Sequence, residues 1–379
     1  MKNTALKITL LWAPLLAWYL IGFFITRSPK YFLTVDTIYF SAGKAWLAAQ
    51  PLYQCEGNGC FVYFPTSAAF FSLFSWMPLK LAELIFRLLS VTMLTLGIFA
   101  FCKTTDAKHY LHRYFFALLA TILLTQPALF NGQCHVLTTG LLLLGFASIA
   151  AQKIWRASFF LALALALKPT SIVLCLLAPF IYPKLRFQLL ATILIIFLLP
   201  FIHFSPSYVL DSYIDFIRRF HEAMQFDAQN ADNWATLFGA IAFYSGHAIN
   251  GGIQFWIRLL AALLTLALCL YMKKKCSLQH LVFFTFTLAM CYLMLFNSRT
   301  ENNDYMMIAP MLGYTLSLVL CKRRWIPTIA MGTGIILICA NWELTRFITP
   351  DNNIWISPTV IAFFTFYFVL REKPLCQKK

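Results

Sequence analysis

Charged residues are scarce in this chain of 379 residues, and acidic ones are scarcer still. Asp and Glu together account for 14 residues and all charged types for 12% of the sequence, whereas 60% of the residues are hydrophobic. A soluble domain has about 25% charged residues, so this composition excludes one. Repeated apolar runs of about 18 to 24 residues are each long enough to cross roughly 30 Å of hydrocarbon. We therefore expect an all-α polytopic membrane protein.

The sequence also lacks the short motifs of nucleotide, metal and redox chemistry. It contains no P-loop, no GxGxxG, no HExxH and no CxxC pair. Such a chain offers no evident place for a nucleotide-activated substrate, so an activated substrate would arrive within the membrane, attached to a lipid. We expect no cofactor and no metal.

Basic residues outnumber acidic ones and are unevenly spread, with a formal net charge of +16. Placing the basic gaps between apolar runs in the cytoplasm satisfies the positive-inside rule, and it leaves only Asp106 and Glu372 of the acidic residues on that side. The basicity therefore indicates a topology with both chain ends inside, and we expect no nucleic-acid partner. The clusters are Lys2 and Lys7; Lys103, Lys108 and Arg113; Lys153 and Arg156; Lys184 and Arg186; Lys273–Lys275; Lys322–Arg324; and Arg371, Lys373, Lys378 and Lys379.

The apolar runs predict about twelve transmembrane helices in one domain, residues 1–379. The first run is too long for the apolar core of a signal peptide, and no small-residue cleavage pattern follows it, so we interpret it as a retained span. The runs cover residues 8–26, 80–102, 114–130, 134–151, a broken pair 157–167 and 170–182, then 187–204, 254–272, 278–297, 304–320, 325–342 and 354–370.

Two longer segments are expected on the outer side. Residues 61–77 are apolar but barely long enough to cross, and a full crossing would reverse the topology of the next basic cluster, so we expect an interface or re-entrant helix within an outer loop, residues 27–79. In the second outer loop, residues 205–252, apolar and charged side chains alternate with helical periodicity, which predicts a helix that lies in the membrane interface.

Most of the 11 cysteines lie singly in apolar runs, where a thiol behaves as a small buried hydrophobe. Cys55 and Cys60 instead flank a Gly/Asn turn in the first outer loop. On an oxidising side of the membrane this pattern predicts a disulfide, with two free thiols as the alternative.

Asp36 is the only carboxylate between the first span and Glu56, in "TVDTIYFSAGKAWLAAQPLY", residues 34–53. Asp is a good N-cap, and a helix-like run follows it, so Asp36 is either a helix cap or a general base that deprotonates an acceptor hydroxyl. Lys168, in "LALALALKPTSIVL", is a cation inside an apolar run that Pro169 breaks. It either snorkels to an interface or faces a lipid phosphate.

Two polar turns are expected on the same outer side. Residues 297–310, "NSRTENNDYMMIAP", contain Arg299, which can fork onto phosphate oxygens, and Glu301 and Asp304, which pair with it or contact sugar hydroxyls. Residues 126–136, "QPALFNGQCHV", form a short turn with Gln133 and His135. Each is a candidate site or an ordinary polar turn. In residues 126–136 the backbone of the turn alone accounts for Asn131-Gly132.

The order of several segments is more specific than any one of them. The first outer loop opens with Asp36 and Tyr39 and continues with "PLY" and "VYFP". Later come "NGQCHVLTTGLLLLG", "LALKPTSIVL", "NADNWATLFGAI" and "SRTENNDYMMIAPML". This series resembles the C-type glycosyltransferases of family 87, with a Tyr-Phe-Pro where the family has Tyr-Pro-Pro and with His135 where Asn is usual.

The resemblance implies a GT-C-like bundle with outer interface helices. It also implies transfer of a hexose or mannose-like sugar from a polyprenyl phosphate to a hydroxyl of a lipid or envelope glycan, at the periplasmic face of a bacterial inner membrane. Asp36 would be the base of a single inverting displacement, and the departing phosphate would be stabilised by Lys168, Arg299 and His135. For sugar or acceptor binding we expect Tyr39, Gln133, Glu301 and Asp304.

A carrier or flippase of a lipid-linked sugar is the competing class, because broken helices and intramembrane lysines also occur in carriers. A carrier should show matching broken segments in its two halves, whereas the sequence signals one break, at Lys168-Pro169. A purely structural membrane subunit would leave the large outer loop unexplained.

Overall fold

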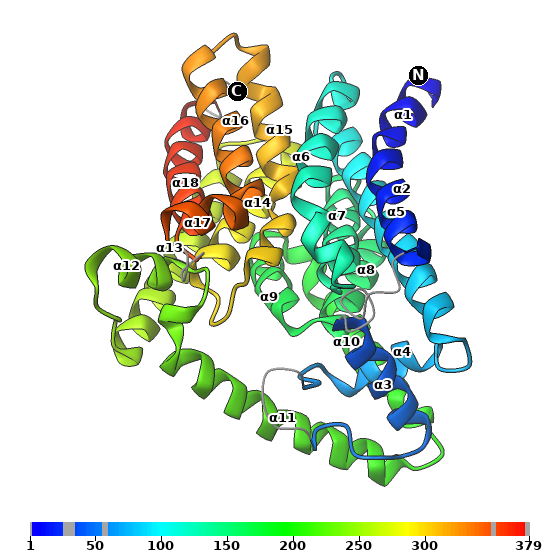
Figure 1. The fold of residues 1–379 in the computed structure, drawn as a ribbon. Helices are drawn as coiled ribbons and strands as arrows, with labels where there is room; N and C mark the ends of the chain where they lie inside the picture. Colours follow the sequence, from blue (N-terminus) through cyan, green and yellow to red (C-terminus); the bar gives the residue numbers. More distant parts are fainter. Residues whose placement is uncertain (1, 26–34, 55–59, 350–353, 376–379) are drawn as a thin grey trace.

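A computed structural model describes residues 2–25, 35–54, 60–349 and 354–375 of the chain, and within these ranges every regular element is a helix (Figure 1). The predicted all-α class is confirmed. The α-helices are α1 (Lys2–Thr9), α2 (Ala13–Ile25), α3 (Val35–Leu47), α4 (Pro65–Ser72), α5 (Leu79–Thr105), α6 (Tyr110–Phe130), α7 (His135–Ala150), α8 (Ile154–Leu167), α9 (Ile172–Ile181), α10 (Arg186–Leu198), α11 (Pro206–Gln229), α12 (Leu237–Ser245), α13 (Gly251–Lys273), α14 (Leu278–Phe296), α15 (Ala309–Cys321), α16 (Trp325–Cys339), α17 (Asn341–Ile348) and α18 (Ile356–Leu375).

Within the described residues, 6 helical segments are long and apolar enough to cross a membrane, or up to 7 if the bent pair α16 and α17 is counted as one span. The other apolar helices, such as α7, α8 and α15, have 10–17 residues. A helix rises about 1.5 Å per residue, so these shorter helices fall below roughly 30 Å of hydrocarbon. The expected count of about twelve spans therefore stays a prediction.

The two ends of the helix bundle differ in character. Helices α3, α4 and α11 lie at one end, and the start of α1 and the end of α18 lie at the other (Figure 1). Helix α4 has 8 residues, about 12 Å of length, so it does not cross a membrane. The segments that we expected on the outer side thus gather at the end opposite to the two chain ends.

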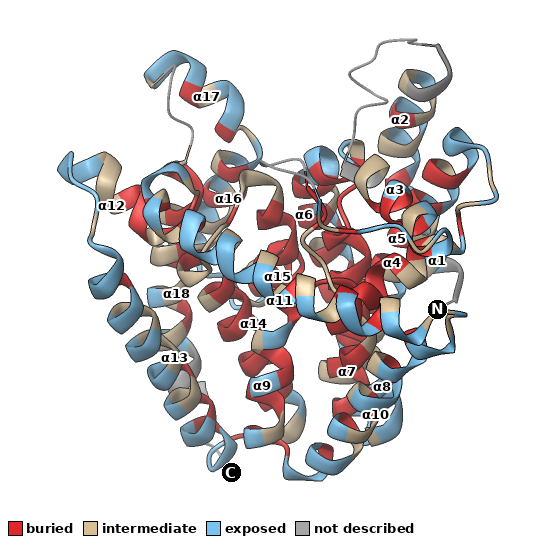
Figure 2. Cartoon of the chain, turned by 90° about the horizontal axis from the view of Figure 1, so that it is seen from below, coloured by how far each residue is buried: buried red, intermediate tan, exposed pale blue. Residues whose placement is uncertain are grey.

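Helix α11 lies across that end as a mostly exposed rod in front of α7, α9 and α14, of which α7 and α14 are mostly buried (Figure 2). Val209, Ser212, Phe216 and Asp227 are its buried residues. Apolar residues such as Ile217 remain exposed beside charged ones. An apolar stripe next to a charged face suits a helix in the interface between water and lipid.

Helix α7 is the most enclosed element, because all its residues from His135 to Ala150 are buried. Its approach to α5 depends on Gly140, where a Cβ would lie 2.5 Å from the backbone nitrogen of Leu94. Small residues allow such close helix packing in membrane proteins. This packing fixes the position of His135, the first residue of α7.

Candidate functional site

The site begins at the break between α8 and α9. Pro169 disfavours helical dihedrals for the residue before it, and Lys168 accordingly has extended backbone angles (φ −148°, ψ 119°). The short 3₁₀ helix η3 (Pro169–Ser171) then leads into α9. The break leaves Lys168 only 7% exposed.

Helix α4 stabilises this break by hydrogen bonds to the end of α8. The last carbonyls of a helix have no partner within it, and here the Thr66 hydroxyl donates to Ala166 O at 2.9 Å, while the Ser67 hydroxyl donates to Leu167 O at 2.8 Å. The "VYFPTS" segment of the first loop therefore supports the position of Lys168. No local pattern predicts this contact, because the two segments lie 100 residues apart in the sequence.

Helix α3 packs closely on α4 at Gly43. A Cβ on Gly43 would lie 2.6 Å from the backbone carbon of Phe71, so only glycine fits there. The ring of Tyr39 stacks on Phe71 with centroids 4.7 Å apart. The small-residue run that follows Asp36 in the sequence therefore brings α3 against α4.

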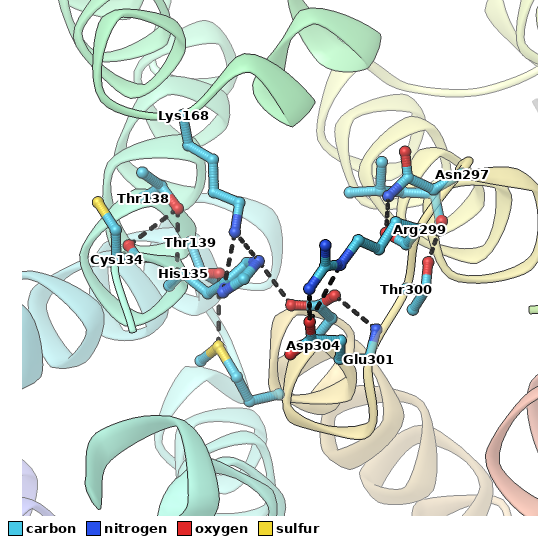
Figure 3. A network of polar contacts seen from close by, with 12 residues as sticks. Cys134, His135, Thr138, Thr139, Lys168, Asn297, Arg299, Thr300, Glu301 and Asp304 are labelled. Atoms are coloured by element: carbon cyan, nitrogen blue, oxygen red, sulfur yellow. Dashed lines mark hydrogen bonds and ion pairs between the residues drawn. The ribbon is translucent and has the colours of Figure 1, made fainter. Parts of the chain in front are cut away.

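His135 lies between a cation and a carboxylate (Figure 3). Lys168 Nζ is 3.0 Å from His135 Nδ1 and also contacts Nε2, and His135 Nε2 is 2.6 Å from Asp304 Oδ1. His135 and Asp304 are 6% and 8% exposed. Charges buried to this extent are stable only when they are paired, and these three residues form the enclosed side of the site.

Asp304 is held by the start of the 3₁₀ helix η7 (Asn302–Met307). Its Oδ2 accepts a hydrogen bond from the backbone N–H of Glu301 at 2.9 Å, as part of a reciprocal capping box. Glu301 Oε1 in turn accepts from Arg299 Nη2 at 2.7 Å. These contacts thus form one chain from Lys168 to Arg299 (Figure 3).

Arg299 and Glu301 form the open side of the site. Their side chains are 33% and 37% exposed. The Arg299 guanidinium also lies over the Trp234 ring, with Cζ 4.4 Å from the centroid, which is a cation–π geometry. Both groups are thus accessible and paired with each other.

Tyr39 is connected to the enclosed side through Tyr63. The two hydroxyls are 3.1 Å apart, and Lys168 Nζ lies 5.9 Å from the centroid of the Tyr63 ring. Asp36 lies one helical turn before Tyr39, in the first turn of α3 rather than before the helix, and its side chain falls outside the described residues. The choice between cap and base therefore stays open at this point.

Two further predicted groups stand apart from this chain of contacts. Gln133 is 7% exposed, and its side-chain amide forms no hydrogen bond with other residues that the structure describes. Cys60 is disulfide-bonded, whereas Cys55 lies outside the described residues. The Cys55–Cys60 pairing therefore stays a prediction.

Sequence reasoning missed four residues at the site: Tyr63, Thr66, Ser67 and Asp227. Asp227 directly follows the amphipathic stretch that predicted α11, and it is 7% exposed. Burial raises its pKa to about 6, although the nearby guanidinium of Arg299 acts in the opposite direction. The only available signal was its position beyond the regular charged face of α11.

No group of three or more His, Cys, Asp or Glu side chains placed to hold a metal ion occurs in the part of the chain that the structure describes. The polar side chains near His135 offer cations and hydrogen-bond donors instead. Such groups are suited to hold an anion, and in a buried position their electrostatic effect is larger than in water.

The fold and the site define a polytopic membrane protein with a buried, cation-containing polar centre. Residues 61–298, more than half of the chain, match glycosyltransferase family 87. The chain belongs to glycosyltransferase family 87, and this membership indicates a membrane glycosyltransferase. No curated protein shows a significant sequence match to it.

Proposed function

We propose that the protein transfers a hexose or mannose-like sugar from a polyprenyl-phosphate donor to a hydroxyl of a lipid or envelope glycan. The reaction takes place at the periplasmic face of a bacterial inner membrane. The observation that carries this proposal, beside family membership, is the buried contact of Lys168 with His135, which in turn contacts the carboxylate of Asp304.

The hydrogen-bonding groups of the enclosed side favour an anionic ligand. The Lys168 ammonium is a donor and the Asp304 carboxylate an acceptor, so a neutral His135 between them, with one N–H and one lone pair, satisfies both. The remaining N–H donors of Lys168 would bind a donor phosphate, and a hydrogen bond between two charged groups is stronger than one between neutral groups. Negative charge grows on the phosphate as its bond to the sugar breaks, and preformed cations stabilise that charge without reorganising.

The transfer is a single displacement at the sugar C1. The acceptor oxygen forms a bond to C1 while the bond from C1 to the phosphate oxygen breaks, so that polyprenyl phosphate leaves and the anomeric configuration inverts. Asp36 accepts the proton of the acceptor hydroxyl. Positions 36 and 39 lie one turn apart on α3, so they share a helix face, and Tyr39 belongs to the site.

Arg299 has a secondary part in this mechanism. Its guanidinium is paired with Glu301 in the structure, so it reaches the phosphate only by leaving that carboxylate. A surface ion pair is worth about 0–1 kcal/mol, and a phosphate with two acceptor oxygens competes well for the guanidinium fork. Glu301 then becomes available for sugar hydroxyls, as does Gln133.

The test uses the purified full-length protein in detergent or nanodiscs. Polyprenyl-phosphate hexoses of defined anomeric configuration are incubated with a membrane extract or with alkyl glycosides, and the product is analysed by mass spectrometry and NMR. We expect a product of inverted configuration at C1. A product of retained configuration would refute the mechanism, and no product with any lipid-phosphate sugar would refute the donor class.

A lipid-linked sugar carrier is the second candidate, and one observation favours it. Helices α16 and α17 form a second broken pair, bent by 78°, where the sequence signalled only the break at Lys168. Carriers have such breaks in both halves. Sealed vesicles with a labelled lipid-linked sugar distinguish the two, because a carrier moves the donor across the membrane unchanged and a transferase consumes it.

A further inference from the structure

Asp227 is a buried carboxylate beside the open side that the proposed mechanism does not use. It lies in the last turn of α11, which ends at Gln229, and it is 7% exposed. A carboxylate is stable in such a position only with a partner, because removal from water penalises the charged form. A residue of this kind calls for a specific explanation.

The end of α11 and the segment after it wrap around the segment of Arg299. Ser298 Oγ lies 3.4 Å from Met224 Sδ, one turn before Asp227. Further along, Ala235 N donates to Thr300 O at 2.8 Å. Asp227 is thereby held next to Arg299 and Glu301.

Two polar groups in this wrapped segment lack partners among the described residues. The Asp227 carboxylate accepts no hydrogen bond and forms no ion pair there. The indole N–H of Trp234 is buried and has no acceptor among the same residues. A buried polar group without a partner is destabilising, so one acceptor group and one donor group are both available to a ligand.

The charges around Asp227 restrict the kind of ligand. Arg299 and Arg258 face it with positive charge, and Glu301 faces it with negative charge. An anionic ligand would meet two carboxylates, and a cationic ligand would meet two guanidinium groups. A neutral ligand with several hydroxyls avoids both conflicts, because a hydroxyl donates to a carboxylate and accepts from an indole N–H.

We propose that Asp227 and Trp234 form the acceptor subsite and bind neighbouring ring hydroxyls of a neutral polyol, a sugar or a cyclitol. The inference rests on the proposed transfer reaction and names the substrate class on its acceptor side. Asp227 accepts from one hydroxyl, the Trp234 N–H donates to the next oxygen, and Arg299 on the Trp234 ring borders the subsite.

The first experiment measures the acceptor KM and the donor KM of Asp227→Asn, with Asp232→Asn as the matched control. Asp232 lies five residues away and is exposed. We expect the acceptor KM to rise about 10-fold in Asp227→Asn, because a charged acceptor of a hydrogen bond is replaced by a neutral one. The donor KM should change less than about twofold, and the Asp232→Asn control should match the wild type.

Trp234→Phe keeps a ring beneath Arg299 and removes only the indole N–H. We expect a rise of about 5-fold in the acceptor KM, the effect of one neutral hydrogen bond. A variant that merely loosened the loop would raise the donor KM as well, and equal changes in the two constants would refute the assignment.

A pH profile separates recognition from structure. Because the pKa of Asp227 is about 6, its carboxylate is charged above that pH and protonated below it. The acceptor KM of the wild type should therefore rise as the pH falls from about 7 to about 5, and the acceptor KM of Asp227→Asn should stay flat. A rise in both proteins would assign the pH effect to another group and overturn the role of Asp227.

The outcomes also separate this inference from the proposed function. If the wild type transfers sugar but Asp227→Asn keeps a normal acceptor KM, the subsite is wrong and the reaction stands. If the wild type does not transfer sugar from any polyprenyl phosphate, the proposed reaction itself is wrong. As a direct probe, methyl hexosides and myo-inositol should protect Asp227 against carbodiimide labelling, whereas inorganic phosphate should not.

Discussion

The enclosed and open sides of the site contain the same kinds of groups in different surroundings. Lys168 and His135 are 7% and 6% exposed, whereas the side chains of Arg299 and Glu301 are 33% and 37% exposed. In water an ion pair is weak, and in a dry environment each charge acts more strongly on its neighbours. In the proposed reaction, the enclosed side would therefore stabilise the transition state, and the open side would exchange ligands.

The difference arises from how each side is supported. The enclosed side depends on close helix packing at Gly140 and on the hydroxyl groups of Thr66 and Ser67, which fix the end of α8. The open side is supported by a short 3₁₀ helix and by the segment after α11. Rigid helices hold groups more precisely than loops, and precision is what the reacting centre needs.

The largest effect is expected from Asp36→Asn. Asn keeps the size of the side chain and most of its capping ability, but it removes the proton acceptor, so the transfer rate should fall about 10²- to 10⁴-fold. Stability should be nearly unchanged. Transfer kinetics and thermal unfolding check both statements.

Asp211→Asn is the control for Asp36→Asn, because Asp211 is an exposed acid on α11. If Asp36 only stabilises the start of α3, the Asp36→Asn variant should turn over normally. The Asp36→Ala variant should then lose about 1 kcal/mol of stability. An active Asp36→Asn enzyme would leave Asp36 as a structural residue. Glu301 or Asp304 would then be the candidates for the base.

The second effect concerns the enclosed cation. Lys168→Met removes a charge-assisted hydrogen bond, which is worth about 1.5–3 kcal/mol, so the donor KM should rise about 10- to 100-fold. The His135–Asp304 contact remains and keeps the carboxylate hydrogen-bonded. Lys184→Met, at an exposed lysine, is the control and should bind donor normally.

Asp304→Asn tests whether the carboxylate positions His135. Without the charged acceptor, the hydrogen bond from the His135 ring weakens and the ring is held less firmly against Lys168, so donor binding should weaken by about 10-fold. The donor KM and the thermal unfolding of the variant check this statement. A loss of stability with an unchanged donor KM would indicate a structural role for Asp304 alone.

The sequence predicted which residues lie at the candidate site better than it predicted which of them contact each other. Lys168, His135 and Asp304 were all proposed, because charged and polar residues in apolar surroundings are conspicuous. The sequence did not show that His135 contacts both of the others, since three separate segments contribute these residues and only tertiary packing joins them. It also missed Thr66 and Ser67, which look like ordinary polar residues in an apolar run.

In the fold, too, features with a local sequence pattern were predicted and features that depend on distant contacts were not. Helical periodicity predicted the amphipathic character of α11, and the proline rule predicted the break at Lys168. The bend between α16 and α17 lies within a run that was read as one span, residues 325–342, and no proline or glycine signals it. There the buried Asn341 donates to Asn302 Oδ1 at 2.7 Å, a contact between distant segments that no local pattern contains.

The smallest effect should come from Arg299→Gln. This variant tests whether the open side contributes less to phosphate binding than the enclosed side. Arg299 is partly exposed and already paired with Glu301, so its net contribution to phosphate binding should be about 1 kcal/mol or less. We expect the donor KM to rise about 2- to 5-fold and to be more sensitive to salt in the wild type than in the variant. Arg218→Gln, on the exposed face of α11, is the control. If Arg299→Gln instead matched the loss seen in Lys168→Met, the guanidinium would be a full member of the phosphate site, and the ion pair with Glu301 would describe only the protein without donor.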